Sequence, residues 1–142
     1  MSAPALAKER GITVSEVRRA SSGAFDSYIR LSVKTERQQR SVAGTVFSDG
    51  KPRVIQVKGI NMEAELAPRV LYVTNLDQPG FIGALGSVLG EHGINIASFN
   101  LGREKPGGDA ISLVSIDNEA SDAVLEEIMA LEQVMQVKQL QF

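Results

Sequence analysis

Hydrophobic and polar residues alternate along most of the first half of the chain. In Tyr28–Lys34, the side chains of Ile29, Leu31 and Val33 would lie on one face of a strand and the polar side chains on the other. This period of two, interrupted by glycine-containing turns, predicts a small antiparallel sheet with one buried face. The elements predicted for this half are a helix over Ala3–Arg10 and strands over Ile12–Arg18, Tyr28–Lys34, Ser41–Phe47, Arg53–Lys58 and Ile60–Leu66.

The pattern changes after Pro68. A short apolar strand over Val70–Thr74 is followed by a loop and then by Phe81, Leu85 and Leu89, which recur at helical spacing. The other elements predicted here are strands over Ile94–Leu101, Ala110–Ile116 and Val134–Leu140, and a second helix capped by Ser121. The order strand-helix-strand-strand-helix-strand is that of a ferredoxin-like unit. We therefore predict an α+β fold, in which a small antiparallel sheet domain precedes a ferredoxin-like βαββαβ domain.

Length and charge lead us to divide the chain into residues 1–66 and residues 67–142. A chain of 142 residues is long enough for two small domains. The first part has 11 basic and 7 acidic residues and the second has 4 and 10, which suggests different partners for the two parts. The net charge of -2 argues against nucleic-acid binding. No secretory signal or run of roughly 18 apolar residues is present, so we predict a cytoplasmic protein without a membrane segment.

The sequence offers little for catalysis or metal binding. It has no cysteine and only one histidine, His92, which excludes thiolate and multi-histidine metal sites. The phosphate-binding motif GxxxxGK[ST] does not occur, and Gly80, Gly83 and Gly86 have a spacing of three that differs from the dinucleotide fingerprint. His92 lies in the last turn of a predicted helix, where a structural role is favoured. We therefore predict no catalytic residue, no metal site and no cofactor in this chain.

The loop before the first long helix of the second half has the groups that a free amino acid requires. An amino acid presents an ammonium, which needs acceptors, and a carboxylate, which needs donors. Asn75 and Asp77 offer side-chain oxygens, the backbone amides near Phe81 and Ile82 are donors at a helix N-terminus, and the Asn95 amide can do both. The residues assigned to this effector site are Asn75, Asp77, Pro79, Gly80, Phe81, Ile82 and Asn95, with Pro79 expected at the first helical position. On spacing alone, the favoured interpretation is that Asp77 caps the helix and that Asn75 and Asn95 are turn residues.

Two segments carry a resemblance to a known family. Leu71–Gly80 (LYVTNLDQPG) and Leu89–Ala97 (LGEHGINIA) resemble the ACT domain, a small-molecule sensor of amino-acid metabolism, and most closely the serine-binding ACT domain of the D-3-phosphoglycerate dehydrogenase family. The first half, with APALAKERGI near its start and Ile55–Gly59 near its end, resembles the intervening domain of the long form of that family. The resemblance implies a regulatory part of an NAD-dependent dehydrogenase involved in serine biosynthesis.

The resemblance also implies a mode of assembly. ACT domains of this family pair side by side around a two-fold axis, with the effector between the Asn75/Asp77 loop of one chain and Asn95 of the other. The implied partners are therefore L-serine or another small amino acid, and a second copy in a dimer or larger homo-oligomer. The family's catalytic domains, which bind NAD, would precede this segment, and its first sheet would associate with a partner that covers it.

The basic first half contains one candidate for anion binding. The family can carry basic residues that bind a phosphorylated substrate in the intervening domain, and Arg53 falls on one of these positions. Glu65 stands where the family has a second basic residue. The alternative interpretation is that these charged residues form a solvent-exposed face of the sheet and bind no ligand.

Four other interpretations stay open at this point. The chain could be a stand-alone amino-acid sensor, the regulatory module of an iron–sulfur serine dehydratase, a purely structural oligomerisation module or an unrelated ferredoxin-like enzyme. The identity of the amino acid and the response of the parent enzyme to serine are likewise open.

Overall fold

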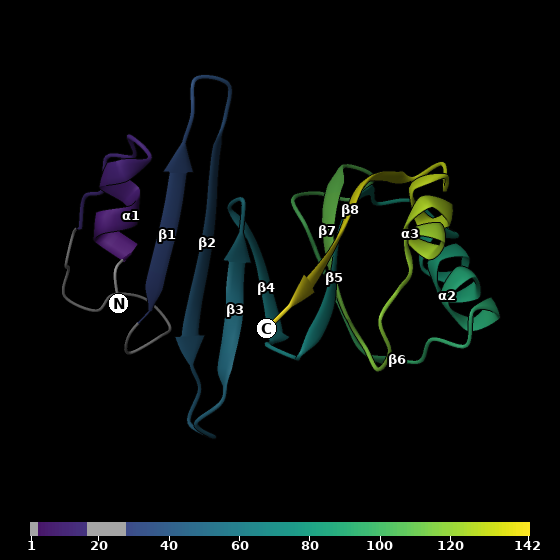
Figure 1. The fold of residues 1–142 in the computed structure, drawn as a ribbon. Coiled ribbons are helices and arrows are strands. Elements are labelled where there is room, and N and C mark those ends of the chain that lie inside the picture. The colour runs from purple at the N-terminus through teal and green to yellow at the C-terminus, as the bar shows by residue number, and fades with distance from the viewer. Residues whose placement is uncertain (1–2, 17–27) are drawn as a thin grey trace.

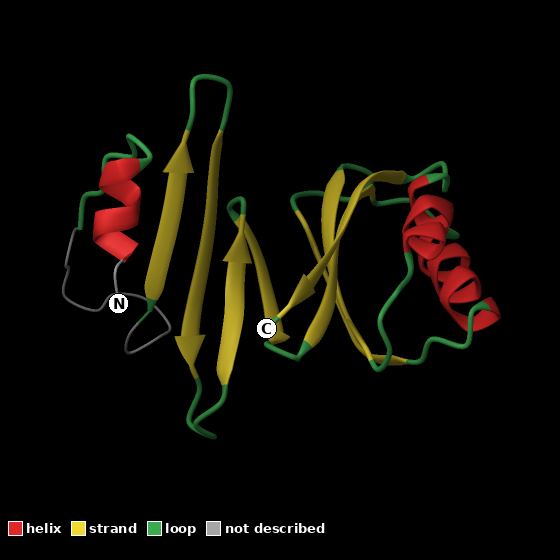
Figure 2. Ribbon diagram, viewed as in Figure 1, coloured by secondary structure: helices red, strands yellow, loops and turns green. Residues whose placement is uncertain are grey.

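A computed structural model describes residues 3–16 and 28–142 and shows two four-stranded antiparallel sheets (Figures 1 and 2). The first sheet is a meander of neighbouring strands in the order β1-β2-β3-β4. Its strands are β1 (Ile29–Lys34), β2 (Gln39–Val46), β3 (Pro52–Val57) and β4 (Ile60–Glu65). The helix α1 (Ala3–Glu9) precedes them in the chain. Between β3 and β4, Lys58 and Gly59 have φ angles of 52° and 80°, which identifies a two-residue hairpin turn that matches the twist of the strands.

One strand predicted for this half is wrong in its described part. Residues 12–16 of the expected strand Ile12–Arg18 have no regular secondary structure, and residues 17 and 18 lie outside the described residues. Ile12 and Val14 are exposed there, and β1 is the first strand of its sheet. Alternating residues form a strand only where a neighbouring strand accepts their backbone hydrogen bonds, and this segment has no such neighbour among the described strands.

The second sheet has the predicted strand-helix-strand-strand-helix-strand order. Its elements are β5 (Arg69–Leu76), α2 (Phe81–Glu91), β6 (Ile96–Arg103), β7 (Asp109–Ile116), α3 (Asp122–Met129) and β8 (Val134–Gln141). The strands lie in the order β6-β7-β5-β8. β6 and β7 pair directly, and one strand separates the two strands joined by each helix, β5 from β6 and β7 from β8, as a split βαβ unit requires. Ser121 caps α3 as predicted, because its side chain accepts a hydrogen bond from the Val124 backbone N–H.

Among the element boundaries that differ from the prediction, two bear on the candidate site. Helix α2 begins at Phe81 with Gly80 as its N-cap, at φ 91°, so Pro79 precedes the cap instead of occupying the first helical position. Strand β6 begins at Ile96, so Asn95 lies just before the strand. In both cases the hydrophobic period identified the element but not its first residue. At α2, the left-handed conformation of Gly80 determines where the helix begins.

Helices α2 and α3 cover one face of the second sheet, and the first sheet lies on the opposite side (Figure 1). The main core lies between the helices and the sheet; its fully buried members include Leu71, Leu85 and Ile128. A second cluster joins the two sheets, with Met62 and Ala64 of β4 packed against Ile111 of β7 and its neighbours. Among the described residues, no helix has the length and apolar character needed to cross a lipid bilayer.

The two sheets approach most closely where β4 crosses β6. A Cβ atom added at Gly102 of β6 would lie 2.7 Å from the backbone oxygen of Asn61 and 2.8 Å from Cγ2 of Ile60. These distances are too short for any side chain, so glycine at this position is a requirement of the contact between the sheets.

The expectation of one buried face holds only for half of the first sheet. Met62 and Ala64 are buried, but Ile29, Leu31 and Val33 of β1 are 72%, 65% and 62% exposed. In the first sheet, the cluster shared with the second sheet is formed by residues of β3 and β4. The prediction of a buried face is therefore wrong for β1, within the part of the chain that the structure describes.

Candidate functional site

Asp77 lies in the loop between β5 and α2, and it is tied to the turn that joins β6 and β7. One oxygen of its carboxylate, Oδ2, accepts a hydrogen bond from Arg103 Nη1 at 2.8 Å and a longer one from the Gly107 backbone N–H at 3.4 Å. Its own backbone N–H donates to the Gly108 carbonyl at 2.8 Å. The Arg103 guanidinium lowers the pKa of the Asp77 carboxyl below its usual value, so Asp77 is an anion at neutral pH.

The helix-cap interpretation of Asp77 finds no support in this geometry. The N-cap of α2 is Gly80, and no side chain caps the helix there. Phe81 is buried in the core, and its backbone N–H makes only a long bond of 3.4 Å to the Gln78 carbonyl. Within the described residues, the N–H groups of Ile82 and Gly83 have no acceptor. These groups at the N-terminus of α2 remain available to an anion.

Asn75 lies in the core and not at the surface of the loop. It is fully buried, its Nδ2 donates to the Leu76 carbonyl at 3.0 Å, and its Oδ1 accepts from the Ser112 hydroxyl at 3.1 Å. Both ends of the amide are thus engaged inside the chain. In this conformation Asn75 fixes the end of β5 and presents neither atom to a ligand.

Asn95 lies at the other end of the sheet. Leu76 of β5 pairs with Asp109 at one end of β7, whereas Asn95 bonds to Asp117, just beyond the other end: Asn95 Nδ2 donates to Asp117 Oδ2 at 2.8 Å. β7 has 8 residues, and a strand rises about 3.3 Å per residue, so on the order of 25 Å separates Asp77 from Asn95. One chain alone does not bring these two residues together.

Arg103 is the site residue that sequence reasoning missed. It is the last residue of β6, 26 positions from Asp77. The sequence offered only a weak signal for this role: Arg103 is one of only 4 basic residues after position 66. The pairing of β6 with β7, and of β7 with β5, brings Arg103 close to the loop that follows β5, and no local motif encodes that contact.

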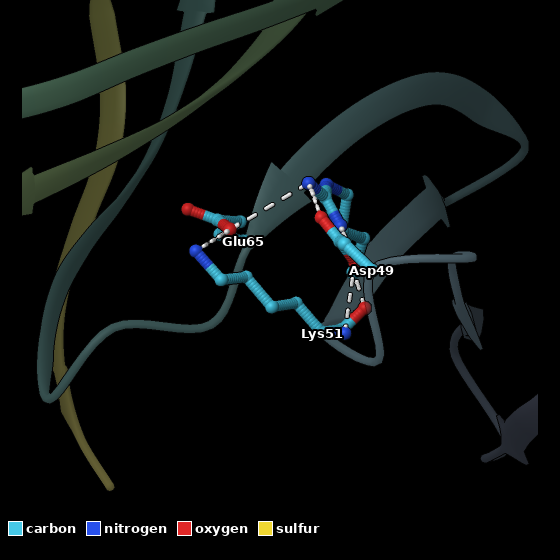
Figure 3. Close-up of polar contacts among 4 residues, drawn as sticks. Asp49, Lys51 and Glu65 are labelled. Atoms are coloured by element: carbon cyan, nitrogen blue, oxygen red, sulfur yellow. Dashed lines mark hydrogen bonds and ion pairs between the residues drawn. The ribbon is translucent and has the colours of Figure 1, made fainter.

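Arg53, the candidate for anion binding, lies in a compact cluster on the first sheet (Figure 3). Its guanidinium makes two bonds to the Asp49 carboxylate, at 2.8 and 3.2 Å, and lies 3.6 Å from Glu65. Lys51 is 3.5 Å from the same Glu65 oxygen, and the Phe47 ring lies 4.4 Å from the guanidinium carbon. Two cations face two carboxylates, so the cluster is neutral. The arrangement gives an incoming anion no excess positive charge, because the Arg53 guanidinium is already paired with Asp49 and Glu65.

The remaining polar clusters are also structural. His92 Nε2 pairs with Glu127 Oε2, which links the end of α2 to α3. No group of three or more His, Cys, Asp or Glu side chains suited to a metal ion occurs in residues 3–16 and 28–142. Near the predicted effector site, the described polar groups that could contact a ligand are those of Asp77, Arg103, the start of α2 and Asn95.

Comparison with known proteins gives matches for both parts of the chain. Residues 1–58 match the family model of the D-3-phosphoglycerate dehydrogenase intervening domain, and residues 69–133 match that of the ACT domain. Similar curated proteins are D-3-phosphoglycerate dehydrogenases of Bacillus subtilis (31% identity over 97% of this chain and 26% of the relative), Synechocystis (35% over 86% and 22%) and Archaeoglobus fulgidus (32% over 95% and 26%). The chain spans about a quarter of the length of the curated relatives it matches.

Proposed function

Because the chain joins a segment of the D-3-phosphoglycerate dehydrogenase intervening domain to an ACT domain, we propose that it is the regulatory part of such a dehydrogenase. In this proposal it binds L-serine between two ACT domains and provides feedback control of an NAD-dependent enzyme. The relatives are dehydrogenases by name, and three quarters of their length has no counterpart here. Catalysis and NAD binding would belong to that remaining part.

The placement of the polar groups at the two ends of β6 carries this proposal. Asn95 immediately precedes β6, and Arg103, its last residue, holds Asp77. β6 is an edge strand that pairs with β7 alone among the described strands. If the β6 strands of two copies pair antiparallel around a two-fold axis, the start of each strand lies beside the end of the other. Asn95 of one copy then meets the Asp77 loop of the other, and two identical sites form.

The groups gathered in this way suit a zwitterion. Asp77 accepts from the ammonium, the free N–H groups of Ile82 and Gly83 donate to the carboxylate, and the Asn95 amide of the second copy contributes a donor and an acceptor. Each charge-assisted bond contributes about 1.5–3 kcal/mol. Pro79 and Gly80 set the start of α2, and Asn75 acts as a positioning residue that fixes the end of β5.

A ligand held by two chains stabilises only the paired arrangement. It therefore shifts the equilibrium between arrangements by its difference in affinity for them, typically about 1–3 kcal/mol. In the complete enzyme this shift would reach the catalytic part through the intervening domain. The close contact of β4 with β6 at Gly102 provides a rigid connection between the ACT sheet and the first sheet.

Calorimetric titration with L-serine tests the proposal. We expect the wild-type chain to bind L-serine and Asp77→Asn and Asn95→Ala each to lose most of that binding. Asp122→Asn, which removes an exposed carboxylate at the start of α3, serves as the matched control and should bind like the wild type. If glycine, L-alanine and L-serine all give no heat at millimolar concentration with a folded wild-type chain, the sensing function is wrong.

A mixing experiment tests whether each site needs two chains. In a heterodimer of the Asp77→Asn and Asn95→Ala chains, one site carries both substitutions and the other carries neither. After unfolding and refolding of an equal mixture, about half of the dimers are mixed, so about a quarter of the wild-type number of sites should return. A mixture that binds no more L-serine than the separate variants would show that the residues act within one chain.

A further inference from the structure

The ion pair between Asp77 and Arg103 uses only part of each side chain. Both hydrogen bonds to the Asp77 carboxylate end on Oδ2, and Oδ1 has no partner among the described residues. Arg103 uses Nη1 alone, which leaves Nη2 and Nε without an acceptor in the same part of the chain. The Asp77 side chain is 19% exposed and that of Arg103 is 52% exposed. Within the described part of the chain, Asp77 Oδ1 and the Nη2/Nε edge of the Arg103 guanidinium therefore remain without partners at the loop between β5 and α2.

We propose that Arg103 is a specificity-determining residue of the effector site, whose guanidinium binds the carboxylate of the amino acid while Asp77 Oδ1 accepts its ammonium. This inference rests on the function proposed above and goes further, because it names a residue outside the loop and the chemical class that it selects. The ligand class is an α-amino acid in its zwitterionic form.

The chemistry of the pair explains why it would prefer a zwitterion. A ligand with a single charge, such as a simple amine or carboxylate, meets one favourable and one unfavourable charge at an ion pair. The pair has no net charge and therefore attracts such a ligand weakly. A zwitterion aligns its ammonium with the carboxylate and its carboxylate with the guanidinium. The carboxylate of the ligand has two oxygens, so one can accept from Arg103 and the other from the N–H groups at the start of α2.

A competing interpretation is that Arg103 only holds the loop. Asp77 already has backbone bonds to the β6–β7 turn through Gly107 and Gly108, so the loop has anchors that do not depend on the guanidinium. A third interpretation is that Arg103 competes with the ligand for Asp77. The three interpretations predict different responses to the charge of the ligand.

The test compares L-serine with L-serinamide, which keeps the ammonium and the hydroxyl but replaces the carboxylate with a neutral amide. Both are titrated calorimetrically into wild type, Arg103→Gln and Arg103→Lys, at a pH where both amines are protonated. We expect Arg103→Gln to weaken L-serine binding about 10- to 100-fold, as the loss of a charge-assisted bond implies, and to change L-serinamide binding less than about threefold. Arg103→Lys should recover part of the loss for L-serine. Lys105→Gln, which removes a neighbouring exposed positive charge in the same turn, is the matched control and should leave both affinities unchanged.

Three outcomes would overturn the inference. An equal loss for both ligands would show that Arg103 only supports the loop, and a gain in L-serine affinity would show that it competes with the ligand. An unchanged L-serine affinity would place the carboxylate elsewhere. If the wild-type chain binds neither ligand, the proposed function itself fails, which is a distinct result.

Discussion

Both sheets contain four antiparallel strands, but their surroundings differ. The second sheet has two helices on one face and strands β3 and β4 against part of the other, whereas the first sheet packs on the second through β3 and β4 and leaves the apolar side chains of β1 exposed. Leu71 of β5 is fully buried, and Leu31 of β1 is 65% exposed. Both residues occupy positions that strand patterns assign to an apolar face.

The difference shows what an alternating pattern encodes. It specifies which side of a strand is apolar, but the layer that covers this side comes from elsewhere in the fold or from another chain. In the second sheet, α2 and α3 supply that layer from the same domain. In the first sheet, the apolar side chains of β1 have no such layer among the described residues.

The largest expected effect is a difference in the free energy of unfolding between two leucine-to-alanine variants, one in the buried core of the second sheet and one on the exposed face of β1. Leu85→Ala removes a fully buried side chain of α2 and should cost about 2–5 kcal/mol, through lost burial and the cavity left behind. Leu31→Ala should change stability by less than about 0.5 kcal/mol, because its side chain is already largely in water. Urea unfolding of both variants at one protein concentration measures the difference.

The control for this comparison is to repeat the unfolding measurements at several protein concentrations. If Leu31→Ala costs as much as Leu85→Ala, and its cost grows with protein concentration, then the β1–β2 face is covered by a second copy in solution. That result would end the contrast between the two sheets. Equal stability of Leu31→Ala and wild type at all concentrations would sustain it.

A smaller effect is expected where the two sheets meet. Gly102→Ala places a Cβ 2.7 Å from the Asn61 backbone oxygen, so β4 must move away from β6, at a cost of about 1–3 kcal/mol. Gly90→Ala in α2 is the matched control: a Cβ there meets no atom within 4 Å, and alanine favours the helix by about 0.5–1 kcal/mol. Thermal unfolding of the pair should therefore show shifts of opposite sign. A neutral Gly102→Ala would mean that the sheets move freely relative to each other.

The sequence predicted the fold better than the details of the site. The split βαββαβ order of the second sheet follows from hydrophobic period and turn residues, which act over short stretches of chain. The ion pair of Asp77 with Arg103 depends on strand pairing across 26 positions, and no local pattern specifies it. Asn75 illustrates the same limit: its residue type fitted a ligand contact, but its position on the inner face of β5, against Ser112, directs both ends of its amide into the core.

The smallest expected effect concerns the polar cluster of the first sheet and its dependence on pH. Arg53, with help from the Lys51 backbone N–H, lowers the pKa of Asp49 from 3.8 to about 2. A carboxyl with a lowered folded-state pKa adds stability above its unfolded value, and that stability is lost as the pH falls from 3.8 towards 2. The melting temperature of wild type should therefore exceed that of Asp49→Asn slightly at pH 6, and the gap should close by about pH 2. Because the group is exposed, the gap should also shrink in high salt. A gap that persists at pH 2 would mean that Asp49 contributes through hydrogen bonds of its neutral form, and that the first sheet depends less on its surface charges than its geometry indicates.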